Sequence, residues 1–313
     1  MSDLAISVRS LRKTYDGIRY AVDGISFDVK RGEIFGLLGK NGAGKTTTIR
    51  MLTTLIKPTS GTIEVLGLDP QREPLEVRKR IGVVQQSESI DFTTVENCMK
   101  IYATLWEVPR EVAKARTEEL MELFDLNPLR KSRAFELSGG QKKRLQVARE
   151  LLHDMDILFL DEPTVGMDPI MRRKVLDYIK RRAGEGLTVV FTTHFLDEAD
   201  YLCDRISIMA GGKIVAQGKA SELKVRYSGL RTLEVDAGSP VRDPAALREA
   251  IVSRGLAQDV SVDGSVVKVI GRNISRELDE VIRVLKANGV YPENITMREA
   301  TLDDVFIQVV GVS

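Results

Sequence analysis

Short apolar runs recur along the first two thirds of the chain, and segments with helical periodicity separate them. Such runs favour strands buried on both faces of a parallel sheet, between layers of helices. They lie at residues 33–39, 80–86, 156–162, 187–194 and 205–212. Before them, segments 5–11 and 24–33 predict antiparallel strands, and segment 60–67 predicts one more strand.

A different pattern covers the stretch from Asp91 to Glu136. Segments 94–106 and 110–126 both have helical character, and Pro109 separates them. Proline disfavours a continuous helix through its own position, so two helices are expected rather than one. We predict a small all-helical insert at about 91–136 within the α/β domain.

The character of the sequence changes again after Gly218. A helical linker at 220–229 precedes six segments in the order strand, helix, strand, strand, helix, strand, with a hairpin turn at Asp263-Gly264. This order predicts a second, smaller α+β domain with a ferredoxin-like fold. The last strand of the six is expected at 293–300 and a final helix at 301–311. The predicted division is a domain at 1–219, a linker at 220–230 and a C-terminal domain at 231–313.

Composition agrees with a two-domain globular protein. The 313 residues are 43% hydrophobic and 29% charged, and the net charge of +1 gives no global bias towards nucleic acid. No apolar run approaches the roughly 18 residues needed to span a bilayer, and the first ten residues lack an apolar signal core. Any membrane role is therefore expected to come through a partner. Cys98 and Cys203 lie far apart in sequence, which favours a reduced chain over a disulfide.

The first chemical motif is the glycine loop, residues 39–46, which fits the pattern G-x-x-x-x-G-K-[ST]. Glycines let backbone N–H groups ring a polyphosphate, and the following helix adds its N-terminal dipole. Lys45 is expected at the β- and γ-phosphates and Thr46 on Mg²⁺. A flexible turn is the alternative. It is disfavoured because a strand precedes the loop and a helix is expected after it at 45–56, with Ile49, Leu52 and Leu55 facing inward. The predicted nucleotide contacts are Gly39, Asn41, Gly42, Ala43, Gly44, Lys45, Thr46 and Thr47.

Further polar residues follow the other buried runs, where ligands of open α/β sheets bind. Asp161 fits a second Mg²⁺ contact, and Glu162 fits a general base that polarises the attacking water. The alternative is a helix N-terminus that favours acidic residues. Gln85 and Gln86 end one run and could ligate Mg²⁺ or lie in an exposed turn. His194 ends another and could donate to the γ-phosphate, although a lone histidine is more often structural, as we expect for His153.

A second motif is "LSGGQ" at 137–141. Ser138 and Gln141 satisfy a helix capping box, which explains them structurally. Gly139 and Gly140, however, fill the first helical turn, where each costs about 1 kcal/mol relative to alanine. Glycines there let another group approach the helix N-terminus, so the segment also fits an anion site.

The ordered set "GKNGAGKTT", "QQ", "LSGGQ", "ILFLDEPT", "MDP" and "TTH" resembles the ATP-binding cassette (ABC) family over residues of about 5 to 219. The resemblance implies an α/β P-loop NTPase of the ABC type, with an antiparallel β subdomain and an α-helical subdomain. It implies a homodimer that sandwiches two ATP molecules with Mg²⁺. Ser138, Gly139, Gly140 and Gln141 of one chain would then contact the γ-phosphate held by the other.

The resemblance also assigns single residues. Gln86, chosen over Gln85 by its offset in the motif, would link the Mg²⁺ site to the helical insert. Tyr15 would stack on adenine, although it could be a simple strand-end tyrosine. Asp168 would cross the dimer interface. Two departures are Lys40, where proline is usual, and "VGMD" in place of "SALD" at 165–168. Neither removes a catalytic position.

The C-terminal domain and its ending "EATLDDVFIQVVG" resemble ATPase subunits of drug-resistance exporters, including daunorubicin-type exporters. The resemblance implies an ATPase that powers export of drugs, lipids or other hydrophobic compounds through a separate membrane permease. The chain would lie in the cytoplasm, peripheral on the inner face of the cell membrane, and the C-terminal domain would regulate or stabilise the dimer. An ABC ATPase that acts on nucleic acid or ribosomes, and an importer ATPase, are the alternatives.

Overall fold

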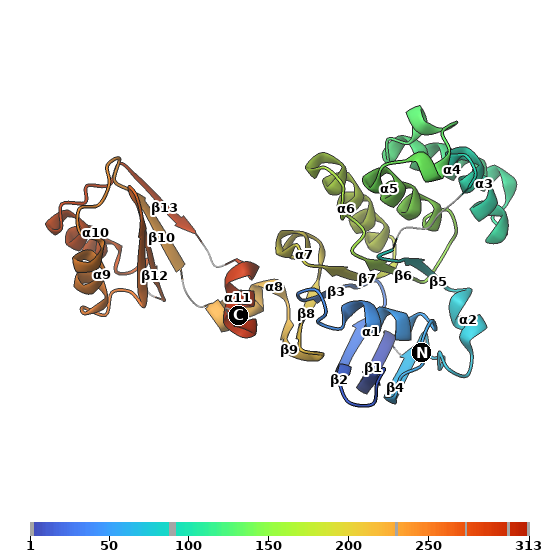
Figure 1. The fold of residues 1–313 in the computed structure, drawn as a ribbon, viewed down its shortest axis with the longest axis horizontal. Coiled ribbons are helices and arrows are strands. Elements are labelled where there is room, and N and C mark those ends of the chain that lie inside the picture. The colour runs from blue at the N-terminus through green and yellow to red at the C-terminus, as the bar shows by residue number, and fades with distance from the viewer. Residues whose placement is uncertain (1–2, 88–91, 229–230, 273, 299–300, 312–313) are drawn as a thin grey trace. The chain divides into compact units, whose positions relative to one another are not determined.

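The computed structural model describes residues 3–87, 92–228, 231–272, 274–298 and 301–311 (Figure 1). The chain divides into two compact units, at 1–219 and 220–313. The predicted start of the helical insert at Asp91 and the ends of the linker (229–230), the last strand (299–300) and the C-terminal domain (312–313) lie outside the described residues.

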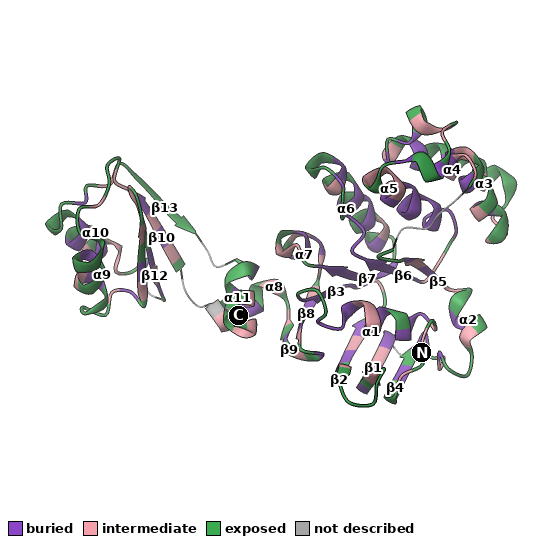
Figure 2. Cartoon of the chain, in the orientation of Figure 1, coloured by how far each residue is buried: buried purple, intermediate pink, exposed green. Residues whose placement is uncertain are grey.

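A six-stranded sheet forms the centre of the first unit, in the order β5-β6-β7-β3-β8-β9. Its first five strands run parallel, and β9 joins the edge antiparallel to β8. Every residue of β3, β6 and β7 is buried (Figure 2), as the apolar runs predict. The strands are β3 (Ile34–Leu38), β5 (Ile81–Val84), β6 (Ile157–Asp161), β7 (Thr188–Thr193), β8 (Arg205–Ala210) and β9 (Lys213–Gly218).

The early strands form a separate three-stranded antiparallel sheet, which confirms the predicted antiparallel pairing. They are β1 (Leu4–Thr14), β2 (Tyr20–Lys30) and β4 (Ser60–Val65), in the order β2-β1-β4. Buried residues of this sheet share one hydrophobic core with α1 (Lys45–Leu52) and one side of the central sheet. The glycine loop between β3 and α1 is therefore held by two sheets.

Of the remaining helices of the first unit, all but the short α2 pack with a second core on the other side of the central sheet. Val77 of α2 belongs to the first core. The helical insert contains α3, α4 and two short 3-10 helices (Asn127–Leu129 and Ala134–Glu136), and α3 also contacts α5. The N-cap Thr94 accepts a hydrogen bond from Asn97, which fixes where α3 begins. The helices are α2 (Pro74–Arg78), α3 (Val95–Leu105), α4 (Arg110–Leu123), α5 (Gly139–Glu150), α6 (Pro169–Gly184) and α7 (Leu196–Leu202).

Two features of the first unit differ from the prediction. The helix expected at 45–56 ends at Leu52, because Thr54 adopts a φ of 66° that a right-handed helix cannot contain. Leu55, predicted to face inward, is consequently 48% exposed. The edge strand β9 was not predicted, since its short sequence is only partly buried and gives a weak strand pattern.

The second unit contains the predicted β-α-β-β-α-β order. Its sheet order, β13-β10-β12-β11 with antiparallel neighbours, is that of a ferredoxin-like fold. The helices α9 and α10 cover one face and enclose a separate hydrophobic core. The elements are β10 (Arg231–Asp236), α9 (Pro244–Val252), β11 (Asp259–Asp263), β12 (Val266–Gly271), α10 (Leu278–Ala287) and β13 (Asn294–Arg298).

The linker region is helical, as predicted, but it is part of the second unit. It consists of α8 (Ala220–Leu223) and a π-helical turn (Lys224–Ser228), and the final helix α11 (Leu302–Val310) packs against both. Among the described residues, none of the helices combines the length and the apolar character that a membrane span requires.

Candidate functional site

The glycine loop is tightly enclosed by the chain itself. A Cβ atom on Gly39 would lie 2.6 Å from the carbonyl oxygen of Met209, and one on Gly44 would lie 2.5 Å from that of Ala21. Gly44 also has a φ of 105°, which disfavours any residue with a side chain. Gly42 has a φ of 81° but open space around it. Packing thus explains two of the glycines, and backbone conformation explains the third.

The helix that follows the loop begins without a side-chain cap. Gly44 is the N-cap of α1, and no side chain accepts a hydrogen bond from its first turn. Helix N-termini leave several N–H donors without an intrahelical acceptor, and these donors favour anions. Asn41 and Gly42 are exposed, Ala43 is buried, and Thr47 is half-buried. The arrangement suits a phosphate group at the mouth of the loop.

Lys45 is buried inside this loop, with only 5% of the residue exposed. Its ammonium group donates hydrogen bonds to the carbonyl oxygens of Gly39 at 2.7 Å and Lys40 at 3.3 Å. It also lies 3.6 Å from Oε1 of Glu162. The charge is therefore held between the loop and the candidate base, within the anion site that the sequence predicts.

Side chains from different elements converge on Glu162, which follows β6. Gln86 Nε2 donates to Glu162 Oε2 at 3.2 Å, and Thr46 Oγ1 donates to Gln86 Oε1 at 3.3 Å. His194 Nδ1, at the end of β7, lies 3.4 Å from Glu162 Oε1. The structure thus brings together Thr46, Gln86, Glu162 and His194, as well as Lys45. Gln85 does not join them through its side chain; its carbonyl oxygen faces α5.

The backbone at Glu162 is unusual. Its φ is 52°, a left-handed conformation that is uncommon outside glycine and clusters at functional sites. Its N–H group donates to the carbonyl and the hydroxyl oxygen of Thr192, both at 3.1 Å. The same hydroxyl donates to Asp161 Oδ1 at 2.5 Å. Thr192 therefore fixes both carboxylate residues, a role that the sequence analysis did not assign.

The oxygen atoms in this region suit a hard cation. Thr46 supplies a hydroxyl, Gln86 an amide carbonyl and Asp161 a buried carboxylate, and such oxygen ligands are those that Mg²⁺ prefers. Among the described residues, there is no group of three or more His, Cys, Asp or Glu residues that could hold a metal by itself. A site built from these three residues would therefore be completed by phosphate oxygens and water, as in other P-loop sites.

A buried carboxylate that the sequence analysis missed holds the segments around the site together. Glu198 on α7 accepts hydrogen bonds from Thr164 at 2.7 Å and Thr193 at 2.9 Å, and pairs with Arg172 of α6 at 3.2 Å. Burial raises the pKa of Glu198, while the two hydroxyl groups oppose that change. Thr193 immediately precedes His194, so this network orients the histidine loop. Its only sequence signal is an acidic residue four positions after the histidine.

The "LSGGQ" segment has the geometry of its structural alternative. Ser138 and Gln141 form a complete capping box at the start of α5. The first-turn glycine Gly140 is explained within the chain, because a Cβ there would lie 2.2 Å from the carbonyl oxygen of Gly166. Packing within the chain therefore gives one reason for this glycine, and the predicted approach of another group to the helix N-terminus stays a prediction. These contacts lie within one chain. The predicted role of the segment at a second chain's nucleotide stays a prediction.

Three further predicted residues lie outside the convergence on Glu162. Tyr15 is 64% exposed at the end of β1, and the Lys13 ammonium lies 5.2 Å from its ring centre. Asp168 is the N-cap of α6, where its carboxylate accepts hydrogen bonds from the N–H groups of Ile170 and Met171, which lower its pKa. His153 is buried and stacks on Trp106, and burial lowers its pKa to about 4.

Comparison with known proteins gives the same picture. A family model described as ABC transporter matches residues 22–165. The daunorubicin resistance ATP-binding protein DrrA3 of Streptomyces coeruleorubidus is 38% identical, over 99% of this chain and 97% of that protein. The Nod factor export ATP-binding protein I of Ralstonia nicotianae is 36% identical, over 98% and 94%.

Among solved structures, a dimeric ATP-binding cassette in a post-hydrolysis state, bound to ADP and Pi, is similar with a TM-score of 0.62 and 26% identity. The match covers 68% of this chain and 98% of that structure. The similarity to these curated relatives extends through the C-terminal unit. We conclude that the chain belongs to the ATP-binding cassette family and is an ATP-binding, ATP-hydrolysing transporter subunit.

Proposed function

We propose that two copies of the chain bind two ATP molecules between them and hydrolyse them to drive export through a separate membrane permease. The observation that carries the catalytic part is the convergence of Lys45, Gln86 and His194 on the carboxylate of Glu162. In this proposal Glu162 accepts a proton from the attacking water. Lys45 holds the β- and γ-phosphates, and His194 donates to the γ-phosphate. Bound Mg²⁺, held by Thr46, Gln86 and Asp161, would offset phosphate charge.

Replacing the base tests this assignment. Glu162→Gln keeps the shape and the hydrogen bond from Gln86 but cannot accept the proton, so turnover should fall by about 100-fold or more. ATP should stay bound, and the protein should accumulate as an ATP-bound dimer on size-exclusion chromatography. Glu119→Gln, an exposed carboxylate on α4, is the matched control and should hydrolyse ATP normally. Wild-type turnover in Glu162→Gln would refute the assignment.

The dimer proposal assigns the "LSGGQ" segment to the second nucleotide. The capping box leaves part of the first turn of α5 at a helix N-terminus, where a γ-phosphate of another copy could bind. Ser138, Gly139, Gly140 and Gln141 would then act in trans, Tyr15 would stack on adenine, and Asp168 would face the partner. The dimeric state of the similar solved cassette supports this arrangement.

The permease and the exported compound are proposed from the named relatives, which export Nod factor or confer daunorubicin resistance. A groove of about 750 Å³ lies along α3 and α4; most of its lining residues are charged or polar, and Ala103, Val108 and Ala113 form its apolar part. Phe92 and Phe135, at the two ends of this insert in the sequence, form an exposed aromatic pair. Such surfaces fit a cytoplasmic helix of a permease, which would place the chain on the inner face of the membrane.

Copurification from membranes distinguishes this proposal from its alternatives. A multi-span membrane protein should accompany the tagged chain after mild detergent extraction. Enrichment of ribosomes or nucleic acid instead would favour a non-transport ATPase. Dependence of the assembled ATPase on a substrate-binding protein would favour an importer.

We also propose that the C-terminal unit strengthens the dimer through β13. All five residues of this edge strand are exposed, including Ile295 at 40% and Met297 at 36%. Ile295 pairs with Val235 of β10, and Met297 pairs with Leu233. Because both partners are buried, Ile295 and Met297 lie on the face of the sheet that carries the core. Antiparallel pairing of two copies about Thr296 would set Ile295 of one against Met297 of the other.

A charge on the β13 face tests this contact in the full chain. Ile295→Lys combined with Met297→Lys should weaken dimerisation in sedimentation experiments, whereas Lys268→Ala, on the opposite face of the same sheet, should not. Unaltered dimerisation and turnover in the charged variant, and after truncation near Tyr227, would refute a role for this unit.

A further inference from the structure

A buried lysine on α5 holds the loop that carries Gln86. Lys143 is only 3% exposed, and its ammonium donates to the carbonyl oxygens of Gln85 at 2.7 Å and Gln86 at 3.1 Å. It also donates to Oε1 of Gln146, one turn along the same helix, at 3.2 Å. Burying an ammonium group is costly unless it is well hydrogen-bonded. These three hydrogen bonds offset that cost and hold the Lys143 side chain in one position.

Gln146 adds a second set of contacts from the same face of α5. It is 4% exposed, and its Nε2 lies 3.2 Å from the carbonyl oxygens of both Gln85 and Ser87. Three successive carbonyl groups, at residues 85, 86 and 87, thus accept hydrogen bonds from two side chains of one helix. This arrangement fixes the direction in which the Gln86 side chain leaves the backbone.

The Gln86 side chain, in turn, contacts the reacting end of the site. Its oxygen accepts from Thr46, and its nitrogen donates to Glu162. A continuous chain of hydrogen bonds therefore runs from Thr46 and Glu162, through Gln86 and its backbone, to α5. The N-terminus of α5 is the "LSGGQ" segment, for which we proposed the trans contact to a second nucleotide.

We propose that Lys143 and Gln146 are positioning residues that make the catalytic placement of Gln86 depend on the position of α5. A movement of the α5 N-terminus onto the second copy's nucleotide would then be transmitted to Gln86, and hence to the base Glu162 of its own chain. This inference deepens the proposed function and rests on it. Neither residue contacts the substrate, so both act through Gln86.

The sharpest test is a double-mutant cycle on ATP turnover by the full-length protein. Lys143→Met removes the ammonium but keeps an unbranched side chain that can fill much of the same space. We expect kcat to fall about tenfold, with affinity for a non-hydrolysable ATP analogue changed less than twofold, because a displaced catalytic group mainly affects the chemical step. In a Gln86→Ala background, the same substitution should lower kcat less than twofold, since its effect acts through the missing side chain.

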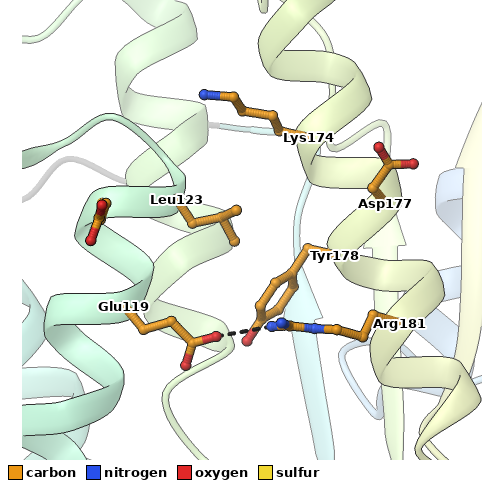
Figure 3. Close-up of a pocket in the computed structure, with 7 residues that line it drawn as sticks. Glu119, Leu123, Lys174, Asp177, Tyr178 and Arg181 are labelled. Atoms are coloured by element: carbon orange, nitrogen blue, oxygen red, sulfur yellow. Dashed lines mark hydrogen bonds and ion pairs between the residues drawn. The ribbon is translucent and has the colours of Figure 1, made fainter.

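Two further variants exclude a purely structural explanation. Lys174→Met is the matched control: this lysine lies on α6 beside a surface groove of about 460 Å³, away from the Glu119–Arg181 ion pair (Figure 3), and its loss should leave kcat unchanged. Gln146→Met keeps Lys143 but removes the amide that donates to Gln85 and Ser87 and the oxygen that accepts from Lys143, so it should lower kcat about threefold even if Lys143→Met fails to fold.

The outcomes separate this inference from the proposed function. An unchanged kcat in Lys143→Met and Gln146→Met, or the same tenfold loss in the Gln86→Ala background, would overturn the inference while wild-type hydrolysis remained intact. A loss of kcat that only follows a loss of folded protein, measured by circular dichroism, would also overturn it. Failure of the proposed function gives a different result. A wild-type chain that did not hydrolyse ATP, or a Gln86→Ala variant that hydrolysed it at the wild-type rate, would refute the proposed site itself.

Discussion

Two helix N-termini of the first unit carry glycines, yet the chain treats them differently. The first turn of α1 follows Gly44 and has no side-chain cap, and the buried Lys45 ammonium lies beside it. The first turn of α5 is closed by the Ser138–Gln141 capping box, and Gly166 packs directly against Gly140. The α1 end is left to a ligand, whereas the α5 end is largely satisfied by its own chain.

One copy can therefore build only the α1 half of the proposed nucleotide site. The site at the N-terminus of α1 brings five side chains into direct contact with one another. They are those of Lys45, Thr46, Gln86, Glu162 and His194. The α5 end offers a capped helix tip, and in the part of the chain that the structure describes none of those five side chains contacts it. A second copy is the simplest way to bring the tip to a phosphate.

The largest effect is expected at the α1 site. Lys45→Ala removes the buried ammonium that would bind the β- and γ-phosphates, so ATP affinity should fall by at least about tenfold, as for loss of a charge-assisted hydrogen bond. Isothermal titration calorimetry measures this directly. Lys57→Ala, an exposed lysine just beyond α1, should bind ATP as the wild type does. Equal affinities in all three proteins would place the phosphates elsewhere.

A smaller effect, on stability rather than binding, is expected at α5. Gly140→Ala places a Cβ 2.2 Å from the Gly166 carbonyl oxygen, so the free energy of unfolding should fall by about 2 to 3 kcal/mol. Gly184→Ala is the matched control, because that helical glycine has open space and alanine there should stabilise by up to about 1 kcal/mol. If both variants had the same melting temperature, the close approach at Gly140 would be wrong.

The smallest effect concerns the far end of α5. Burial raises the pKa of Glu150 to about 7, from 4.5 in the unfolded chain, so the folded protein retains a proton that the unfolded chain releases between these values. The stability from this group is therefore present below pH 4.5 and is lost as the pH rises through 7.

Replacing this carboxyl group by an amide tests the sign of that dependence. Glu150→Gln should remove the decline in stability and raise the free energy of unfolding at pH 8 by about 1 to 2 kcal/mol, since loss of the Arg149 pair offsets part of the gain. Denaturant unfolding at pH 5 and pH 8 measures it. Destabilisation at pH 8 would show that the ion pair outweighs burial.

Much of the fold could be predicted from sequence because its strongest signals are local. The strands β3, β6 and β7 are buried on both faces, so their sequences are uninterrupted apolar runs. The β-α-β-β-α-β order of the second unit follows from alternating periodicities. The partly exposed β9 and the left-handed turn at Thr54 carry no such pattern, and both were missed.

At the site, motif spacing predicted which residues gather but not what holds them. Thr46, Gln86, Glu162 and His194 follow different strands and meet because those strands are parallel neighbours. The buried supports, Glu198 and Lys143, depend on long side chains that reach across the fold, so no spacing in sequence reveals them. The reason for Gly140 likewise lies in Gly166, 26 positions later, and becomes visible only in the folded chain.

The proposed function depends on one nucleotide being bound by the α1 site of one copy and the α5 N-terminus of another. A structure of Glu162→Gln with ATP and Mg²⁺ tests it most directly. We predict Ser138 Oγ within hydrogen-bond distance, about 3 Å, of the γ-phosphate that contacts the other copy's Lys45. A triphosphate fully bound by Lys45, with Ser138 of every copy far from it, would rule out a nucleotide shared between two copies.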